Sequence, residues 1–512
     1  MQTFGAFLVS FLAASGLAAA GGHGGSSGLG CDSQRPLVSS EKLQSLIKKE
    51  DLLAGSQELQ DIATAHGGHR AFGSSGHNAT VDFLYYTLKA LDYYNVTKQP
   101  FKEIFSSGTG SLTVDGEDIE AETLTYTPSG SATDKPVVVV ANVGCDAADY
   151  PAEVAGNIAL IKRGTCTFSQ KSVNAKAAGA VAAIIYNNAE GKLSGTLGQP
   201  FLDYAPVLGI TLEAGEALLA KLAGGPVTAT LQIDALVEER VTYNVIAETK
   251  EGDHSNVLVL GGHTDSVPAG PGINDDGSGT IGMLTVAKAL TKFRVKNAVR
   301  FAFWSAEEYG LLGSYAYIKS INSSAAELSK IRAYLNFDMI ASPNYIYGIY
   351  DGDGNAFNLT GPAGSDVIER NFENFFKRKH TPSVPTEFSG RSDYAAFIEN
   401  GIPSGGLFTG AEVLKTEREA ELFGGRAGVA YDVNYHQAGD TVDNLALDAF
   451  LLNTKAIADS VATYALSFDG LPRVDGKKRR WDAHRARMLK RSAGSHGHAH
   501  LHSGPCGGGA SI

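Results

Sequence analysis

The sequence predicts an α/β protein whose mixed, mostly parallel sheet carries helices on both faces and is interrupted by a β-rich insert. Three observations support this fold class. Short apolar runs alternate with helical stretches beyond Val241, which is typical of a parallel sheet with crossover helices. Residues 40–110 repeat apolar side chains every three or four positions, as amphipathic helices do. Residues 111–237 instead contain short apolar runs separated by turn residues, which indicates strands.

The first 39 residues contain a predicted signal peptide and a flexible segment before the predicted folded domains. Residues 1–20 are mostly apolar, lack charged side chains and end in Ala18-Ala19-Ala20, a pattern that predicts a signal peptide and hence secretion. Residues 21–39 begin with a Gly/Ser-rich stretch and are expected to be flexible. Residues 40–110 then form the first part of the α/β domain.

The insert and the second part of the α/β domain each have a predicted element order. In the insert, strands are expected at 136–140, 158–161, 181–186 and 227–231, with a helix at 171–180. In residues 241–468, strands are expected at 256–260, 299–304, 333–337 and 403–408, and helices at 277–292, 308–319, 365–378, 392–399 and 446–466. Ligands of such sheets gather at the carboxyl ends of the parallel strands, so residues directly after each strand are the candidates for chemistry.

Charge and cysteine content restrict the class of protein. The net charge is −12, and an acidic chain is unsuited to nucleic-acid binding. After the signal peptide no run of about 18 apolar residues occurs, so no membrane anchor is expected, and the chain is expected to be monomeric. Residues 469–512 are basic and rich in His and Gly, which predicts a disordered tail.

The four cysteines and four sequons fit an oxidising compartment. Cys145 and Cys166 lie 21 residues apart in the insert and are the first candidate disulfide, whereas Cys31 and Cys506 could be paired or free. The sequence also contains four N-glycosylation sequons. They begin at Asn78, Asn95, Asn322 and Asn358.

Two acidic or histidine-bearing turns follow predicted strands in the α/β domain. His263 comes after the strand at 256–260 and is a candidate zinc ligand, with Asp265 placed to fix its imidazole tautomer, although a structural role is the common alternative. Asp275 and Asp276 stand in a Gly-rich turn before a helix. They could cap the helix, or one carboxylate could bridge two metal ions.

Three further positions complete the candidate cluster. Glu307 and Glu308 follow the next strand, where one can bind a metal ion while the other acts as general base for water. Asp338 lies in an apolar strand and needs a partner, which a metal ion would supply. His436 follows Tyr435 and precedes Asp440, a candidate to orient its ring.

Together these positions match the ligands that zinc prefers. Two His and three acids supply nitrogen and oxygen donors without sulfur, and each of two metal ions would take one His, one acid and a share of Asp275. The five expected ligands are His263, Asp275, Glu308, Asp338 and His436.

The motifs that contain these residues resemble those of the di-zinc aminopeptidase Y family, which includes secreted fungal and bacterial leucine aminopeptidases. The shared motifs are G-G-H-T-D-S-V, G-I-N-D-D-G-S-G, W-S-A-E-E, N-F-D-M and Y-H-Q-A-G-D-T. The resemblance covers about 241–467 and the helix that starts at Asn78. Residues 111–237 resemble a protease-associated domain through G-N-I-A-L-I-K-R-G and K-A-A-G-A-V.

The resemblance implies a zinc exopeptidase fold, two Zn²⁺ per subunit and a role for each residue. One zinc would be held by His263, Asp275 and Asp338, and the other by Asp275, Glu308 and His436. Glu307 would be the general base and acid, and Tyr435 would stabilise the oxyanion. Arg391 would contact the substrate, Phe408 and Thr409 would form the wall of the pocket for the first side chain, and the Asp275–Asp276 peptide would be cis.

The resemblance also has one departure and leaves alternatives open. Relatives often have Cys on both sides of the last His, where this chain has Asn434 and Gly439, so we expect a less stable loop with retained activity. The implied substrates are peptides with a free amino terminus. A carboxypeptidase, a single-zinc glutaminyl cyclase and a non-catalytic receptor-like protein are the alternatives on the same scaffold.

Overall fold

The computed structural model describes residues 35–193 and 195–473. The expected signal peptide, Cys31, Cys506 and residues 474–512 of the expected tail lie outside these ranges. The expectation of flexibility over 21–39 is wrong for residues 35–39, because Val38 is buried and its backbone N–H donates to Arg294 O. In the described ranges, no helix combines the length and apolarity that crossing a bilayer requires.

The larger domain is built on a mixed sheet whose central strands are parallel, as predicted. Strands β9, β10, β11 and β14 run parallel, and β12 and β8 join them in antiparallel fashion. In spatial order the strands are β13 (Val384–Thr386), β12 (Gly348–Tyr350), β14 (Ser404–Phe408), β11 (Ile331–Phe337), β9 (Asp253–His263), β10 (Asn297–Trp304), β8 (Thr228–Thr249) and β1 (Tyr94–Val114).

Helices cover both faces of this sheet, and the alternation of side chains along β9 shows why. Leu258 and Leu260 point into one hydrophobic core, whereas Val257 and Val259 point into the other, and all four are fully buried. The first core is closed by α1 (Ser40–Ser45), α2 (Lys49–Ala65), α3 (Ser75–Ala90), α6 (Gly277–Leu290), α9 (Ser365–Arg378) and α12 (Leu447–Tyr464). The second is closed by α7 (Leu312–Ile321), α8 (Ala325–Lys330) and α10 (Tyr394–Ile398). A further helix, α11 (Glu417–Phe423), has no buried residue in its described length.

The insert is a small α/β domain rather than a purely β-rich one. Its parallel strands are packed between α4 (Phe168–Ala177) and α5 (Leu212–Gly224), and α5 was not expected from the sequence. The strands are β2 (Glu117–Ile119), β3 (Glu122–Thr123), β4 (Gly130–Val139), β5 (Ile158–Lys162), β6 (Ala182–Tyr186) and β7 (Val207–Ile210). The predicted disulfide joins Cys145 to Cys166, with their Cα atoms 5.7 Å apart.

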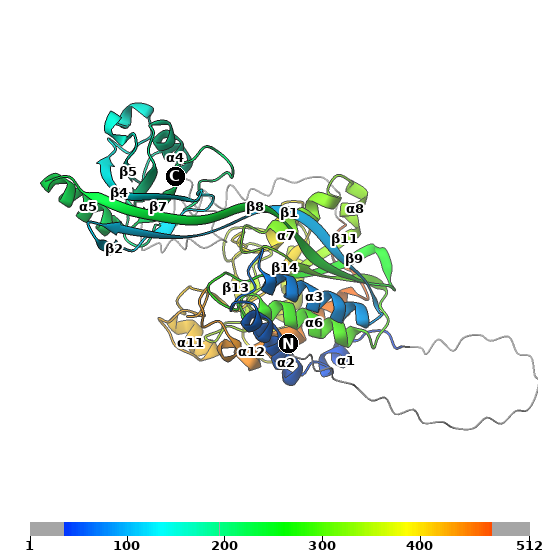
Figure 1. Ribbon diagram of the computed structural model, residues 1–512. Helices are drawn as coiled ribbons and strands as arrows, with labels where there is room; N and C mark the ends of the chain where they lie inside the picture. Colours follow the sequence, from blue (N-terminus) through cyan, green and yellow to red (C-terminus); the bar gives the residue numbers. More distant parts are fainter. Residues whose placement is uncertain (1–34, 194, 474–512) are drawn as a thin grey trace, which may run out of the picture.

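Two long strands connect the domains. β1 and β8 pair without interruption from Tyr94↔Thr249 to Val114↔Ala229 and form a ribbon that reaches from the large domain into the insert (Figure 1). The domain borders expected at 111 and 237 therefore fall inside these two strands. In the middle of the ribbon, apolar side chains such as Phe105, Leu236 and Val241 stand among charged ones, so no continuous apolar run marks the two strands in the sequence.

Two predictions near the candidate site differ from the structure: the start of one helix and the placement of Asp338 within a strand. The helix expected at 308–319 begins only at Leu312, because the backbone N–H groups of Gly310 and Leu311 both donate to Glu307 O and form a turn. Strand β11 ends at Phe337, so Asp338 follows the strand instead of lying within it. Glu307, Glu308 and Asp338 are thus all in loops at the carboxyl end of the sheet.

Candidate metal centre

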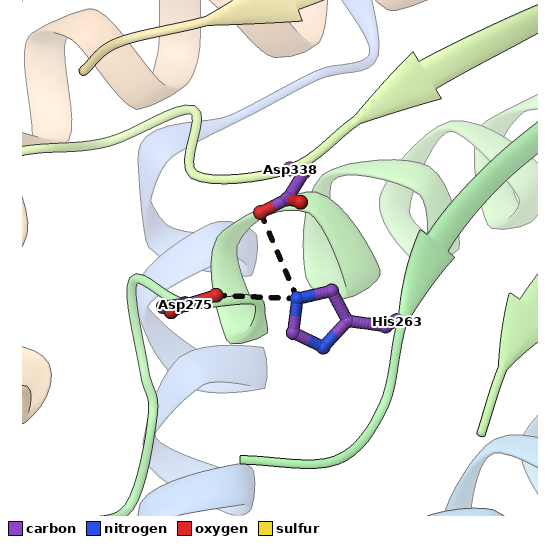
Figure 2. Close-up of side chains that lie close together, drawn as sticks. All are labelled: His263, Asp275 and Asp338. Atoms are coloured by element: carbon purple, nitrogen blue, oxygen red, sulfur yellow. Dashed lines mark ion pairs between the residues drawn. The ribbon is translucent and has the colours of Figure 1, made fainter. Parts of the chain in front are cut away.

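The five predicted ligands come together at the carboxyl ends of the parallel strands. His263 ends β9, Glu308 lies in the turn after β10, and Asp338 directly follows β11. Asp275 precedes α6, and His436 comes from the loop before α12. Figure 2 shows how β9, β11 and the turn before α6 bring His263, Asp338 and Asp275 together.

The ligands form two groups that share Asp275. His263 Nε2 lies 3.2 Å from Asp275 Oδ1 and 3.7 Å from Asp338 Oδ1. His436 Nε2 lies 3.2 Å from both Asp275 Oδ2 and Glu308 Oε2. Each group offers three donor atoms within 4.8 Å of one another. The two oxygens of one carboxylate thus face two different imidazoles, as a bridging ligand requires.

The imidazole of His263 lies against both the backbone and the side chain of Asp265. His263 Nδ1 lies 3.1 Å from the backbone carbonyl of Asp265 and 3.8 Å from its Oδ1, so the tautomer with a proton on Nδ1 leaves Nε2 free to bind metal. The Asp265 carboxylate also accepts from the backbone N–H groups of Glu307, at 3.1 Å, and Glu308, at 3.3 Å. The Asp265 carboxylate therefore positions the turn that contains Glu307 and Glu308.

Asp338 is oriented by a chain of buried hydrogen bonds that the sequence did not indicate. Ser392 Oγ donates to Asp338 Oδ2 at 2.6 Å, which leaves Oδ1 toward His263. Ser392 in turn accepts from Asn336 Nδ2 at 2.8 Å, and Asn336 accepts from Tyr334 at 3.0 Å. Since each donor in the chain is fixed by the next, the rotamer of Asp338 is set by the fold.

The two acids before α6 have separate functions. Asp276 caps the helix, because its Oδ1 accepts from Gly279 N at 2.8 Å, and its Oδ2 accepts from His263 N at 3.0 Å. Asp275 points into the cluster, so the capping interpretation is confirmed for Asp276, while the bridging interpretation stays a prediction for Asp275. The peptide between them is cis, as the family resemblance implied.

Asp440 does not orient the His436 ring as the sequence suggested. Its carboxylate accepts from the backbone N–H groups of Asn274, at 2.8 Å, and Asp275, at 3.0 Å. Burial raises its pKa to about 8, and the neighbouring Asp432 adds to this effect. Asp440 therefore holds the turn that contains Asp275.

The acidity of the cluster fits bound cations. Burial raises the pKa of Glu307 well above its ordinary value, with Glu308 and Asp338 adding to the increase while His263 opposes it. Several buried carboxylates this close cannot all ionise without positive charge between them. In addition, His436 Nε2 is buried and makes no hydrogen bond to the described residues, although it faces two carboxylates. The donor atoms and their charge thus fit zinc.

Beside the cluster, Tyr435 and Arg391 are connected. The ring of Tyr435 stacks on His436 with centroids 3.8 Å apart, and its hydroxyl accepts from Arg391 Nη2 at 3.2 Å. Arg391 Nη1 donates to Glu412 at 2.7 Å. The sequence did not single out Glu412, because a Glu in a loop without a motif gives no signal.

A cavity of about 360 Å³ opens next to the cluster and contains both predicted substrate-contacting side chains Arg391 and Phe408 in its lining. Thr409 is not part of that lining, which corrects the expectation: its Oγ1 donates to Met339 O and accepts from Ser342 N at 3.0 Å. Further apolar lining residues that sequence reasoning missed are Met339, Ile346, Tyr350, Phe357, Val413 and Tyr431. They come from loops and short strands without a shared pattern.

The sequons lie on several elements of the large domain. Asn78 in α3, Asn95 in β1 and Asn358 are exposed, whereas Asn322 after α7 is half-buried. Glycosylation at these positions stays a prediction.

Comparisons with known proteins agree with this geometry. Residues 244–461 match the model of peptidase family M28, and residues 133–218 match that of the PA domain. The chain is 58% identical over 442 residues to a probable leucine aminopeptidase 2 of Aspergillus fumigatus, covering 86% of this chain and 88% of that protein. It is 52% identical over 479 residues to a probable leucine aminopeptidase 2 of Aspergillus oryzae, covering 92% and 95%.

Solved structures agree in fold. An aminopeptidase from Aneurinibacillus sp. strain AM-1 has a TM-score of 0.62 at 27% identity, covering 86% of this chain and 98% of that one. A zinc aminopeptidase from Bacillus subtilis has a TM-score of 0.61 at 25% identity, covering 84% and 98%. The chain therefore belongs to peptidase family M28, as a zinc-dependent aminopeptidase that carries a PA domain.

Proposed function

We propose that this aminopeptidase binds two zinc ions and removes the first residue of peptides with a free amino terminus, with a preference for large apolar first residues such as leucine. The main support for the proposal is that the two carboxylate oxygens of Asp275 face different histidines: Oδ1 faces His263 and Oδ2 faces His436. Each half of the carboxylate belongs to a complete three-donor group.

The preference for an apolar first residue rests on the cavity. Its walls include Phe408, Ile346 and Phe357, and it opens directly beside His263 and Asp338. A pocket of this composition stabilises a buried leucine side chain by about 2 kcal/mol relative to water. The related fungal proteins are themselves described as leucine aminopeptidases.

Selection of the amino end follows from charge. The cavity is lined by one buried carboxylate, Glu307, in addition to those of the two three-donor groups. A protonated amino terminus is attracted to this additional carboxylate, whereas an acylated one is not. Glu307 also lines the cavity that would receive the first side chain.

The chain's own residues perform the proton transfers. Zinc, when bound, acts as a Lewis acid that polarises the carbonyl and makes water nucleophilic at neutral pH. Glu307 accepts the proton of the attacking water on its carboxylate as the new C–O bond forms. Tyr435 donates its hydroxyl proton in a hydrogen bond to the developing oxyanion, an orientation supported by the donation from Arg391 to the tyrosine oxygen. Glu307 then passes its proton to the leaving amine as the C–N bond breaks.

Secretion is part of the proposal. The apolar residues 1–20, the Cys145–Cys166 disulfide and the exposed sequons all suit an oxidising, extracellular environment. Intact mass spectrometry of protein from a culture supernatant would detect removal of residues 1–20 and added glycans. A chain that keeps its first 20 residues would contradict secretion by this route. The monomeric state stays a prediction.

The test of the activity combines metal content with two substrates. We expect two zinc ions per chain, cleavage of leucine p-nitroanilide, and no cleavage of its N-acetylated form. Peptides blocked at either end separate an aminopeptidase from a carboxypeptidase, and conversion of an N-terminal glutamine would indicate a cyclase. One zinc per chain would contradict the two-zinc proposal, and zinc binding without any cleavage would favour a receptor-like protein.

A further inference from the structure

The residues between two of the zinc ligands are held by a buried arginine from a distant part of the sequence. His263 and Asp275 are separated by the loop 264–272, which has no regular secondary structure. Arg70 lies in the segment before α3 and is fully buried. Its guanidinium donates through Nε to Pro271 O at 2.8 Å, through Nη2 to Gly272 O at 2.5 Å, and through Nη1 to Thr264 O.

The main chain of Arg70 adds to this contact. Arg70 N donates to Ser266 Oγ at 2.9 Å, and Ser266 N donates back to Arg70 O at 3.3 Å. Ser266 Oγ also donates to Gly270 O at 2.9 Å. Both ends and the middle of the loop are therefore tied to one residue.

The acceptors of Arg70 are unusual for a buried cation. The guanidinium donates to three backbone carbonyls. Among the described residues it makes no hydrogen bond to a carboxylate. A buried charge ordinarily pairs with an opposite charge. The carboxyl groups of Asp265, Asp440, Asp276 and Asp275 act on it at longer range, and they raise the pKa of Arg70 against the lowering that burial causes. The carboxyl groups therefore favour the charged form of Arg70 from a distance, while its hydrogen bonds hold the loop 264–272 in place.

We propose that Arg70 is a positioning residue of the metal centre: by clamping the loop 264–272 it sets the separation of His263 and Asp275 and so raises the affinity for zinc. This inference rests on the proposed zinc site. A planar guanidinium can donate to three carbonyls in fixed directions, whereas a lysine ammonium is a single point on a flexible stem. The shape of the arginine, and not its charge alone, is therefore what the loop needs.

A second interpretation makes the opposite prediction. If Arg70 served mainly as a positive charge beside the carboxylates, it would repel zinc, and its removal would strengthen zinc binding. Arg70→Met removes both the charge and the hydrogen bonds, whereas Arg70→Lys keeps the charge but loses the planar set of donors that reaches three carbonyls. The two variants therefore separate the effect of shape from that of charge.

The chain offers a matched control. Arg332 is also buried, with 7% of its surface exposed, and it donates to Leu471 O at 2.9 Å and Asn256 Oδ1 at 2.7 Å. It is the second residue of β11, at the end of the strand opposite to Asp338. Arg332→Met should lower the melting temperature without changing the affinity for zinc.

The experiment measures zinc affinity of the metal-free full-length protein by competition with a fluorescent chelator, after circular dichroism has shown that each variant is folded. We expect Arg70→Lys and Arg70→Met both to weaken zinc binding by about 10- to 100-fold, the range typical for partners of metal ligands. Arg332→Met should stay within twofold. Ser266→Ala keeps the guanidinium and should weaken zinc binding by a smaller factor, which preserves the test if the Arg70 variants do not fold.

Unchanged zinc affinity in folded Arg70→Lys, or tighter binding in Arg70→Met, would overturn the proposal. So would an equal loss of affinity in Arg332→Met, because it would show a general effect of stability. No substrate is used, so an inactive wild-type enzyme would contradict the proposed function while leaving the zinc comparison valid. A wild-type chain that binds no zinc would contradict both.

Discussion

Replacing Glu307 with glutamine should abolish most turnover while keeping the metal centre. Glu307 is 2% exposed, lines the cavity, and places Oε2 3.9 Å from His263 Nε2, farther than the 3.2 Å contact that Asp275 makes. It belongs to neither three-donor group at the centre. Glutamine has the same shape but cannot accept a proton from water, so the general-base step is lost without loss of a ligand.

The expected magnitude follows from this single role. Loss of a general base costs about 10²- to 10⁴-fold in rate, or about 3–5 kcal/mol in the activation free energy. The fall should be in kcat, with KM nearly unchanged, because the side chain acts in the transition state. The assay is steady-state cleavage of leucine p-nitroanilide together with zinc content by mass spectrometry.

Glu308→Gln is the matched control, since it makes the same replacement of a carboxylate oxygen by an amide NH2 group at the adjacent residue. Glu308 Oε2 lies 3.2 Å from His436 Nε2 within the second donor group, so this variant should lose zinc as well as activity. If Glu307→Gln keeps kcat within threefold of the wild type, Glu307 is not the base. If it loses zinc as readily as Glu308→Gln, the division between base and ligand is wrong.

Three further predictions test other parts of the molecule. Glu412→Ala removes the hydrogen-bond acceptor of Arg391 and should lower kcat for leucine p-nitroanilide about tenfold, because a hydrogen-bond donor is then misplaced. Glu412→Gln should recover part of the rate. Equal rates in the wild type and both variants would show that Glu412 does not position Arg391. The variants Cys145→Ser and Cys166→Ser each remove the disulfide and open the loop that it closes, across a sequence separation of 21. Each should lower the free energy of unfolding by about 3 kcal/mol in urea titrations. No change would show that the stability of the insert does not depend on the disulfide. Burial raises the pKa of Glu369 to about 7, so its ionisation on going from pH 5 to 8 disfavours the folded state. Glu369→Gln should therefore reduce the fall in melting temperature over that range, and an unaltered fall would contradict the raised pKa.

Four of the five candidate metal ligands could be predicted from sequence because each lies next to a structural signal. His263 ends an apolar strand, Glu308 and Asp338 follow apolar strands, and parallel strands bring their carboxyl ends to one edge. Asp275 precedes a helix whose Gly-rich start is visible in the sequence. Side chains that orient the ligands lack such a signal. That Asp265 lies against an imidazole and also accepts from two backbone N–H groups depends on the turn after β10, which no local pattern describes.

The error at Thr409 has a simpler cause. β14 ends at Phe408, and successive side chains of an extended chain point to opposite sides. If Phe408 lines the cavity, Thr409 must face away from it, and its hydroxyl bonds to Met339 and Ser342 accordingly. Only one of two adjacent residues could therefore have belonged to the pocket wall.

The loop that carries His436 shows how a network can take the place of a crosslink. A Cβ atom on Gly439 would lie 2.2 Å from Asn434 Oδ1, so the two positions where relatives often have cysteines do face each other here. Asn434 Nδ2 donates to Asn444 Oδ1 at 2.7 Å, and Asn444 Nδ2 donates to Asp432 Oδ2 at 2.9 Å.

Asp432 connects this loop to the other half of the site. Its Oδ2 also accepts from Asn274 Nδ2 at 2.7 Å, and Asn274 directly precedes Asp275, the proposed bridging ligand. A disulfide between 434 and 439 would close only the His436 loop on itself, whereas these hydrogen bonds connect that loop to the turn that contains Asp275. The two ligands are thus held relative to each other by side chains that must all be paired at once, since a buried polar group left without a partner costs about 1–3 kcal/mol.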